Sequence, residues 1–397
     1  MTGRWEFKIP KDFSLISNTE ETLDAICSLI SSSKKFKPGQ AIHVDHLGCE
    51  NMDLAASAVL DAITLEIMKE LPPGTFRIDG SIPLNGQVRQ LMINVGLPRQ
   101  LGINIKPDPG AFILPLPLQR GRRQQPGKYE GQSEAERVAG ALANHLKECF
   151  QKAAGYELPL SVTRQIVKWL PEVIGNAEDH SATDDWWAIS YLVPHDPAEY
   201  QRTCAGVGGA FLGEVQLTVF NFGRSFFESL NADTTAPTLK EAIRDLAKRH
   251  SLMGWFIDND YSERDLWTLY ALQDGVSRFA GRPGDIDRGW GTVRMIQAFQ
   301  RLGGTVRQGL IPRMILISGD TQISFDPKYQ LKYQDVADGQ RSIIAFNSEN
   351  SLEQRPDKAY VRSLKSFFPG TLLAFRFFID KKHLETLELE QTQISND

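Results

Sequence analysis

A proline-rich stretch at residues 107–131 is the feature that most constrains how this chain can fold. Proline fixes φ and lacks a backbone N–H, so it is disfavoured in helix interiors and in the middle of a sheet. We therefore expect a linker here, with a separate folding unit on each side of it. The basic cluster Arg120-Gly-Arg-Arg123 fits a solvated linker better than a phosphate-binding patch.

Length and composition also favour several domains. The chain has 397 residues, of which 41% are hydrophobic and 23% charged, as in soluble globular proteins of two or three domains. Its net charge of −5 argues against nucleic acid as a partner. The four cysteines lack metal-site or disulfide spacing, and the start of the chain lacks the apolar core of a signal peptide. Because no apolar run reaches membrane-spanning length, we expect no membrane association and a cytoplasmic location.

Residues 1–106 are predicted to form a small α/β unit. An alternating strand at 41–45 precedes a helical pattern at 52–71, and a second strand at 75–78 precedes a helix at 88–95. Alternation of strands and helices favours a sheet covered by helices.

Residues 132–380 are predicted to form a larger unit, followed by an acidic tail at 381–397. Ser133 and Glu136 have the spacing of a capping box, which predicts the start of its first helix. The later predicted elements are a helix at 162–180, strands at 187–193 and 215–220, an irregular helical insert, a helix at 293–302, and strands at 313–319 and 372–378.

The most unusual motif lies at the end of the helix predicted at 162–180. Glu172, Asn176 and His180 recur in steps of four, which places them one turn apart on one helix face. Asn is a poor helix-interior residue, and such a row does not suit a face that packs on apolar neighbours. It suits a site that needs an oxygen ligand for Mg²⁺ beside a base. A solvated helix face is the alternative, and the row alone does not separate the two.

Three further polar or glycine-containing features follow this row and could complete a nucleotide site. Glycines that open a helix let backbone N–H groups approach a phosphate, and the helix dipole favours an anion there. A polar residue at a strand end can read a base. In order, the features are a strand end at Asn221-Phe-Gly223, a helix start at Arg288-Gly289-Trp-Gly291-Thr292, and Pro-Gly-Thr371 before the last strand.

The order of these motifs resembles that of the GHKL superfamily, the Bergerat-type ATP-binding fold of histidine kinases and gyrase-type topoisomerases. The Glu-x-x-x-Asn-Ala-x-x-His helix is most similar to that of bacterial anti-sigma-factor serine kinases. The likeness covers about residues 158–380 and implies an α+β two-layer sandwich that binds ATP and Mg²⁺. It implies that Asn176 is the Mg²⁺ ligand, that Glu172 is the catalytic base, and that His180 lies at the edge of the phosphates.

The resemblance also implies how the nucleotide would be held. Gly289, Gly291 and Thr292, with Arg288 beside them, match the glycine box that wraps the phosphates, and Thr371 matches a late Gly-Thr beside the adenine.

The first glycine box of the family, Asp-x-Gly-x-Gly, is altered in this chain. Asn221 replaces the Asp that accepts the adenine amino group, Gly223 is kept, and Ser225 replaces the second glycine. An Asn carbonyl can still accept that hydrogen bond, although the charge is lost.

The insert at 224–288 matches the position of the family's ATP lid. Arg278, Arg282 and Arg288 are candidates to meet the γ-phosphate, with surface arginines as the alternative. The tryptophans Trp255, Trp267 and Trp290 are expected to pack within the insert rather than to stack on a base.

Residues 1–106 have a fainter likeness to the STAS domains of anti-anti-sigma factors. Phe76-Arg-Ile-Asp-Gly and Val95-Gly-Leu, on either side of the helix at 88–95, carry it. Ser57 is the residue nearest to a phosphoacceptor position. The pairing would join a kinase module and its substrate module in one chain.

These features support two functions. One is a Mg²⁺-dependent enzyme that hydrolyses ATP or transfers its γ-phosphoryl group to a partner protein, as a regulator in bacterial signalling or defence. The other is a catalytically weak nucleotide-dependent switch, which Asn221 favours and Glu172 opposes. Both imply a regulatory protein partner and leave a homodimer open. A histidine kinase is disfavoured because His145 lacks the surrounding residues of a phosphoacceptor motif.

Overall fold

The chain has a mixed α/β structure that divides into two units. The first consists of residues 1–119, 189–191 and 365–367, and the second of the remaining residues. The computed structural model describes residues 4–36, 40–70, 77–103, 105–106, 114–122, 133–154, 157, 160–194, 211–276, 291–302, 311–336, 339–380, 383, 385–386 and 389. Among the described helices, none combines the length and the apolar character needed to cross a membrane.

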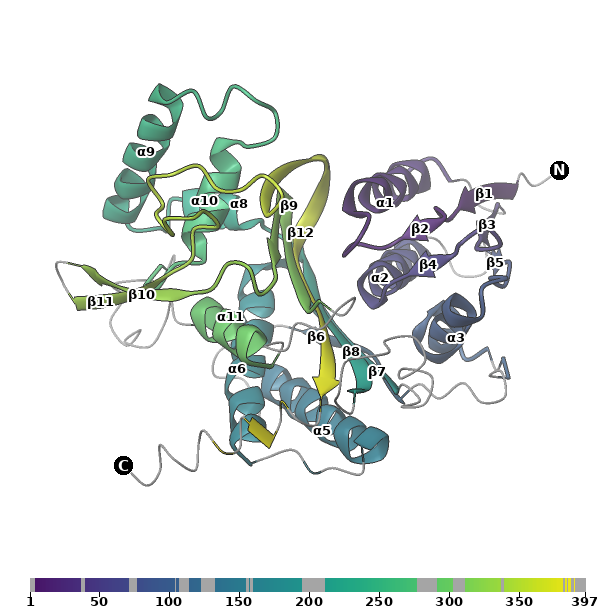
Figure 1. Ribbon diagram of the computed structural model, residues 1–397. Helices are drawn as coiled ribbons and strands as arrows, with labels where there is room; N and C mark the ends of the chain where they lie inside the picture. Colours follow the sequence, from purple (N-terminus) through teal and green to yellow (C-terminus); the bar gives the residue numbers. More distant parts are fainter. Residues whose placement is uncertain are drawn as a thin grey trace. The chain divides into compact units, whose positions relative to one another are not determined.

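Three short parallel strands organise the N-terminal unit (Figure 1). β1 (Arg4–Lys8), β3 (Ala41–Asp45) and β5 (Arg77–Gly80) form a sheet in the order β1-β3-β5. Parallel neighbours need crossover connections, and α1 (Thr19–Ser33) and α2 (Leu54–Glu70) lie in the two crossovers. The alternation of strand and helix predicted for this unit is thereby confirmed.

The remaining elements of this unit are a pair of short strands and two consecutive helices. They are β2 (Asp12–Phe13), which pairs in parallel with β4 (Asn51–Met52), and the consecutive helices α3 (Gly86–Val95) and α4 (Leu97–Gln100). Asp53 anchors the start of α2, because its Oδ2 accepts from Ser14 Oγ at 2.6 Å and its Oδ1 accepts from the Ala56 N–H at 2.7 Å. Such a carboxylate satisfies donors at the helix N-terminus that have no partner within the helix.

A five-stranded sheet has the order β6-β7-β8-β12-β9, and all of β8 and β9 and most of β7 and β12 belong to the second unit. β12 is antiparallel to both of its neighbours, and its Thr371 lies opposite Asn221 on β8 and Ser318 on β9. The strands are β6 (Leu114–Arg122), β7 (Ser181–Pro194), β8 (Phe211–Gly223), β9 (Arg313–Phe325) and β12 (Val361–Asp380). A separate hairpin joins β10 (Lys332–Val336) to β11 (Gly339–Ile343).

Three helices lie together along one face of this sheet (Figure 1). They are α5 (Glu134–Ala154), α6 (Leu160–His180) and α11 (Gly291–Leu302), and α6 packs on β8 and between the other two helices. The capping box predicted at the start of α5 is confirmed, since Ser133 Oγ accepts from the Glu136 N–H at 3.1 Å and Glu136 Oε2 accepts from the Ser133 N–H at 2.9 Å.

The first part of the insert between the glycine motifs is folded onto the sheet. It holds α8 (Phe226–Asn231), α9 (Pro237–Leu252) and α10 (Glu263–Ala271), and α8 and α10 pack on β9. Trp267 is 1% exposed and packs with Leu230 and Ile243, as expected for a core residue of the insert. Residues 277–290 lie outside the described part.

The structure differs from the expected linker at residues 114–122, which form β6. β6 stands at the edge of the sheet, where a strand tolerates prolines because one side of it needs no ladder hydrogen bonds. Arg120 pairs with the nearly buried Asp185 of β7, and Arg122 Nε lies 3.4 Å from the same carboxylate. These two arginines of the basic cluster therefore hold a sheet edge instead of forming a solvated linker.

Candidate functional site

The Glu172–Asn176–His180 row lies on the C-terminal half of α6, as predicted. Val173 and Ile174, between the row residues, are 1% and 0% exposed, so the helix is anchored in the core beside the row. Glu172 and Asn176 are both partly exposed. His180 is the last residue of α6, and its side chain lies outside the described part of the structure.

The start of α11 closely approaches this row. A Cβ atom at Gly291 would lie 2.9 Å from Glu172 Oε2 and 3.3 Å from Asn176 Nδ2. The first distance is shorter than a Cβ contact, so a side chain at position 291 would displace the Glu172 carboxylate from its present place. The structure thus brings Gly291 and Thr292 beside Glu172 and Asn176, although more than a hundred residues separate them. Arg278, Arg282, Arg288, Gly289 and Trp290 lie outside the described residues.

The Glu172 carboxylate has a partner that the sequence reasoning missed. Arg294, one turn into α11, donates from Nη1 to Glu172 Oε1 at 2.8 Å. The two side chains are 43% and 36% exposed, so the ion pair is screened by water and contributes at most about 1 kcal/mol. The spacing of Arg294 from Gly291 on the same helix face was the only signal of this contact.

Asn221, Thr371 and Ser318 form a buried polar row across three neighbouring strands. Asn221 is 0% exposed; its Oδ1 accepts from the Thr371 N–H at 3.0 Å, and its Nδ2 donates to the Ala177 carbonyl at 2.5 Å. Thr371 Oγ1 in turn lies 3.0 Å from Ser318 Oγ. Asn221 therefore connects β12 to α6, and both ends of its amide are used within the protein.

Gly370 allows β12 to come close enough for these bonds. Its φ is +152°, and a Cβ atom there would lie 2.1 Å from the Asn221 carbonyl oxygen. No other residue fits such a backbone position without displacing the strand. The Gly-Thr pair selected from the sequence thus has a structural reason in this chain.

Ser225, at the position where the GHKL motif has its second glycine, has a local role in this structure. Its Oγ accepts from the Glu228 N–H at 3.2 Å, and Glu228 Oε2 accepts from the Ser225 N–H at 2.8 Å. This capping box begins α8 directly after the end of β8 at Gly223. The segment from Gly223 to Ser225 therefore joins the end of β8 to the start of α8.

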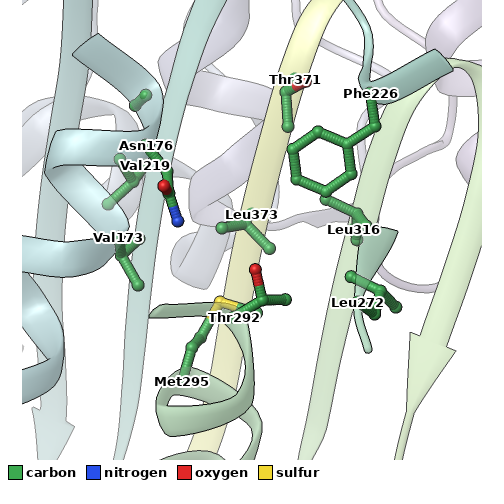
Figure 2. A pocket seen from close by; sticks show the side chains of 11 residues that line it. Val173, Asn176, Val219, Phe226, Leu272, Thr292, Met295, Leu316, Thr371 and Leu373 are labelled. Atoms are coloured by element: carbon green, nitrogen blue, oxygen red, sulfur yellow. The ribbon is translucent and has the colours of Figure 1, made fainter. Parts of the chain in front are cut away.

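A small cavity lies where α6, α11 and the sheet meet (Figure 2). Its volume is about 20 Å³, which is room for one water molecule. The polar side chains among its described lining residues are Asn176, Thr292 and Thr371; the rest of the lining is apolar and includes Phe226 and Met295. Figure 2 shows the Phe226 ring below Thr371, directed into the cavity.

The donor set fits Mg²⁺ only as a shared site. Within the described residues, no three His, Cys, Asp or Glu side chains gather as a metal-binding group. Mg²⁺ often binds through one protein oxygen together with phosphates and water, which Asn176 could provide from the cavity wall. Among the described residues we find no hydrogen bond to the Asn176 side-chain amide.

Comparisons with known proteins leave the family open. No protein-family model, no curated protein and no solved structure matches this chain. The GHKL and STAS-like likenesses therefore rest on the motifs of this chain alone.

Proposed function

We propose that the C-terminal unit binds Mg²⁺–ATP at the meeting point of α6, α11 and β12, and that it hydrolyses ATP or transfers its γ-phosphoryl group to a protein. This is the chemistry of a GHKL-type domain, and the sheet with α5, α6 and α11 along one face is consistent with a Bergerat-type two-layer sandwich. The N-terminal unit would be a STAS-like partner module, for which its parallel sheet is a coarse support.

One observation carries the proposal. Asn176, Thr292 and Thr371 were selected from motifs far apart in the chain, and they are the polar side chains among the described lining residues of one cavity. A chance match of short motifs gives no reason for them to meet. The close approach of Gly291 to Glu172 and Asn176 brings a second motif to the same place.

The residues suggest a division of labour. Bound Mg²⁺ would neutralise phosphate charge, held on the protein side by Asn176. The backbone N–H groups at the start of α11 would face the phosphates, where the helix dipole favours an anion. Glu172, at the half-exposed edge, would orient a water or hydroxyl and accept its proton. Catalysis would rest on positioning and charge neutralisation.

The test is ATP turnover by the full-length chain, followed together with transfer of labelled phosphate to protein. We expect Mg²⁺-dependent turnover that falls about a hundredfold or more in Glu172→Gln, because a general base contributes factors of that size. Arg294→Ala serves as the matched control, since it removes the ion-pair partner of Glu172 and keeps the carboxylate. Equal turnover by Glu172→Gln and wild type would refute the assignment of the base.

A second candidate function is a nucleotide-dependent switch with negligible turnover. The small size of the cavity and the internal hydrogen bonds of Asn221 favour it. The cavity holds about 20 Å³, and both ends of the Asn221 amide are bonded within the protein. Tight Mg²⁺–ATP binding without turnover or label transfer would select this function over the enzyme.

A further inference from the structure

A large cavity in the N-terminal unit lies outside the nucleotide site proposed above. Its volume is about 350 Å³, and it lies between α2, the end of α3, α4 and the strands β3 and β5. Cavities of about 150 Å³ already bind benzene when their lining is apolar. This cavity therefore has room for a molecule well above that size, and its described lining belongs to one unit.

Two hydroxyl groups of α2 reach this cavity without a hydrogen-bond partner. Ser57 and Thr64 both line it, lie two helical turns apart on one face of α2, and are each 4% exposed. Among the described residues, neither hydroxyl takes part in a hydrogen bond. Neither hydroxyl oxygen is fully enclosed by protein atoms, and both side chains are otherwise buried on α2. The space that these two oxygens can reach is therefore the cavity.

Asp61, between the two hydroxyls on α2, closes the cavity wall. Its Oδ2 is enclosed by protein atoms without a partner, and the Leu97 backbone N–H at the start of α4 donates to its carboxyl. Burial raises the pKa of this carboxyl well above its ordinary value, so the neutral acid is favoured. The free hydrogen-bonding groups on this face of α2 are thus the hydroxyls of Ser57 and Thr64.

The charges around the cavity favour an uncharged ligand. Its described lining holds no Lys or Arg, so a phosphate or carboxylate would enter without a counter-charge. Of its other ionisable groups, Asp79 is already paired with Arg4 at 3.1 Å and with His43. Burial lowers the pKa of His46, which favours the uncharged imidazole.

We propose that this cavity binds an elongated uncharged molecule with an apolar middle and an oxygen at each end, one bonded to Ser57 Oγ and the other to Thr64 Oγ1. A hydroxyl both donates and accepts, so an alcohol or a carbonyl of the ligand can bond to it. Seven residues of helix rise about 10.5 Å, which sets the approximate separation of the two oxygens.

The apolar middle of the ligand has matching partners in the lining. Met92 and Ile78 line the same space from α3 and β5. Ile82 and Ile103, which also line it, are 46% and 54% exposed and mark an apolar entrance. A buried hydroxyl without a partner costs free energy, which the bound ligand would recover at both ends. This site does not depend on the nucleotide site.

The experiment compares three probes that share an eight-carbon chain, namely 1,8-octanediol, 1-octanol and octanoate. Each is titrated into the full-length chain with labelled Ile and Met methyl groups, and shifts of Met92 and Ile78 report on the cavity. We expect the diol and the alcohol to bind. Octanoate should bind about tenfold or more weakly than 1-octanol, because its charge loses water and finds no counter-charge.

Variants that remove one hydroxyl test the two ends separately. Ser57→Ala and Thr64→Val should each weaken binding of 1,8-octanediol about fivefold, the usual net effect of one hydrogen bond. 1-Octanol can turn end for end and keep one bond, so its affinity should change little in either variant. Ser31→Ala, which removes an exposed hydroxyl of α1 outside the cavity lining, is the matched control and should leave both affinities unchanged.

Stability gives a readout that needs no ligand. Because the Thr64 hydroxyl has no partner in the protein, Thr64→Val should unfold at the same urea concentration as wild type or at a higher one. If Ser57→Ala does not fold, diol binding by Thr64→Val still decides. Unchanged diol binding in the variants, octanoate as the tightest probe, no shift at Met92 and Ile78, or a lowered unfolding midpoint of Thr64→Val would overturn the proposal.

Discussion

Two cavities of this protein differ in whether the polar groups beside them are hydrogen-bonded. The cavity at α6, α11 and β12 holds about 20 Å³ and adjoins a row in which Asn221, Thr371 and Ser318 bond to one another. A second cavity, between α2, α4 and the strands β3 and β5, holds about 350 Å³ and is lined by Asp61, whose Oδ2 is buried without a hydrogen-bond partner. Motifs in the sequence pointed to the cavity at α6, α11 and β12, here called the closed cavity. No motif pointed to the cavity beside α2, here called the open cavity. The presence of a recognisable motif in the sequence therefore does not indicate how much space a cavity offers in the structure.

We expect the largest effect from a substitution of Asn221, in the buried polar row that adjoins the closed cavity. In Asn221→Asp the side chain can no longer donate an N–H to the Ala177 carbonyl, and a fully buried carboxylate would face that oxygen. We expect a loss of about 3 kcal/mol in the free energy of unfolding at pH 8, measured by urea denaturation.

This cost should depend on pH. Burial would raise the pKa of the new carboxyl in the folded state, and the protonated form could donate to Ala177. The loss should therefore be small near the ordinary carboxyl pKa and grow as pH rises towards the raised value. If the loss of stability does not depend on pH, or if the variant is as stable as wild type at pH 8, then Asn221 does not make the hydrogen bonds described for it.

A pair of glycine variants tests the close approach of α6 and α11 beside this cavity. Gly291→Ala places a Cβ atom 2.9 Å from Glu172 Oε2, and we expect Mg²⁺–ATP affinity to fall about tenfold or more. Gly175, beside Asn176 on α6, is the matched control because a Cβ atom there meets no atom within 4 Å. Gly175→Ala should stabilise the helix by about 0.5–1 kcal/mol and keep the affinity. Equal affinities of the two variants would argue against a site at this junction.

Phe226 tests whether the difference in volume matters for binding. Its ring is directed into the small cavity, and removing it enlarges the space beside Thr371 (Figure 2). If ATP must displace this ring, Phe226→Ala should bind Mg²⁺–ATP about fivefold more tightly, because less rearrangement is needed. Calorimetric titration of both proteins measures the ratio. Weaker binding by the variant would mean that the ring contacts the nucleotide instead of blocking it.

In the open cavity, Asp61→Asn should give the smallest effect. The raised pKa of Asp61 means that wild-type stability falls as pH rises from the ordinary carboxyl pKa to the raised one. An amide has no such dependence, so the variant should gain stability relative to wild type over this range. Asp79→Asn should instead lose stability relative to wild type, since a hydrogen bond with His43 lowers the pKa of Asp79. This loss is fully present above the ordinary carboxyl pKa and fades as the pH falls below it. Denaturation midpoints from about pH 3 to about pH 8 check both signs.

Local patterns in the sequence predicted the helices and strands better than they predicted how these elements pack against one another. The α6 row, the alternating strand β3 and the capping box at Ser133 follow from spacing and propensity, and the structure confirms them. Ser225 with Glu228 has the same capping-box spacing, so the start of α8 was also readable from the sequence. The residues at 114–122 misled because prolines are tolerated in a strand only at a sheet edge, and edge position is a property of the whole sheet.

Contacts between distant segments account for the rest. The Arg294–Glu172 ion pair and the bonds of Asn221 to Ala177 and Thr371 depend on how helices and strands pack. Residue spacing also cannot predict that Asp61 Oδ2 has no hydrogen-bond partner, because this depends on which side chains pack around it.

One titration tests the central claim and the comparison together. Mg²⁺–ATP is added to the full-length chain with labelled methionine methyl groups, where Met295 reports on the cavity at α11 and Met92 on the cavity beside α2. The proposed nucleotide site predicts a saturable shift of Met295 that requires Mg²⁺, with Met92 unchanged. A shift of Met92 alone, or no shift of Met295 at millimolar Mg²⁺–ATP, would contradict it.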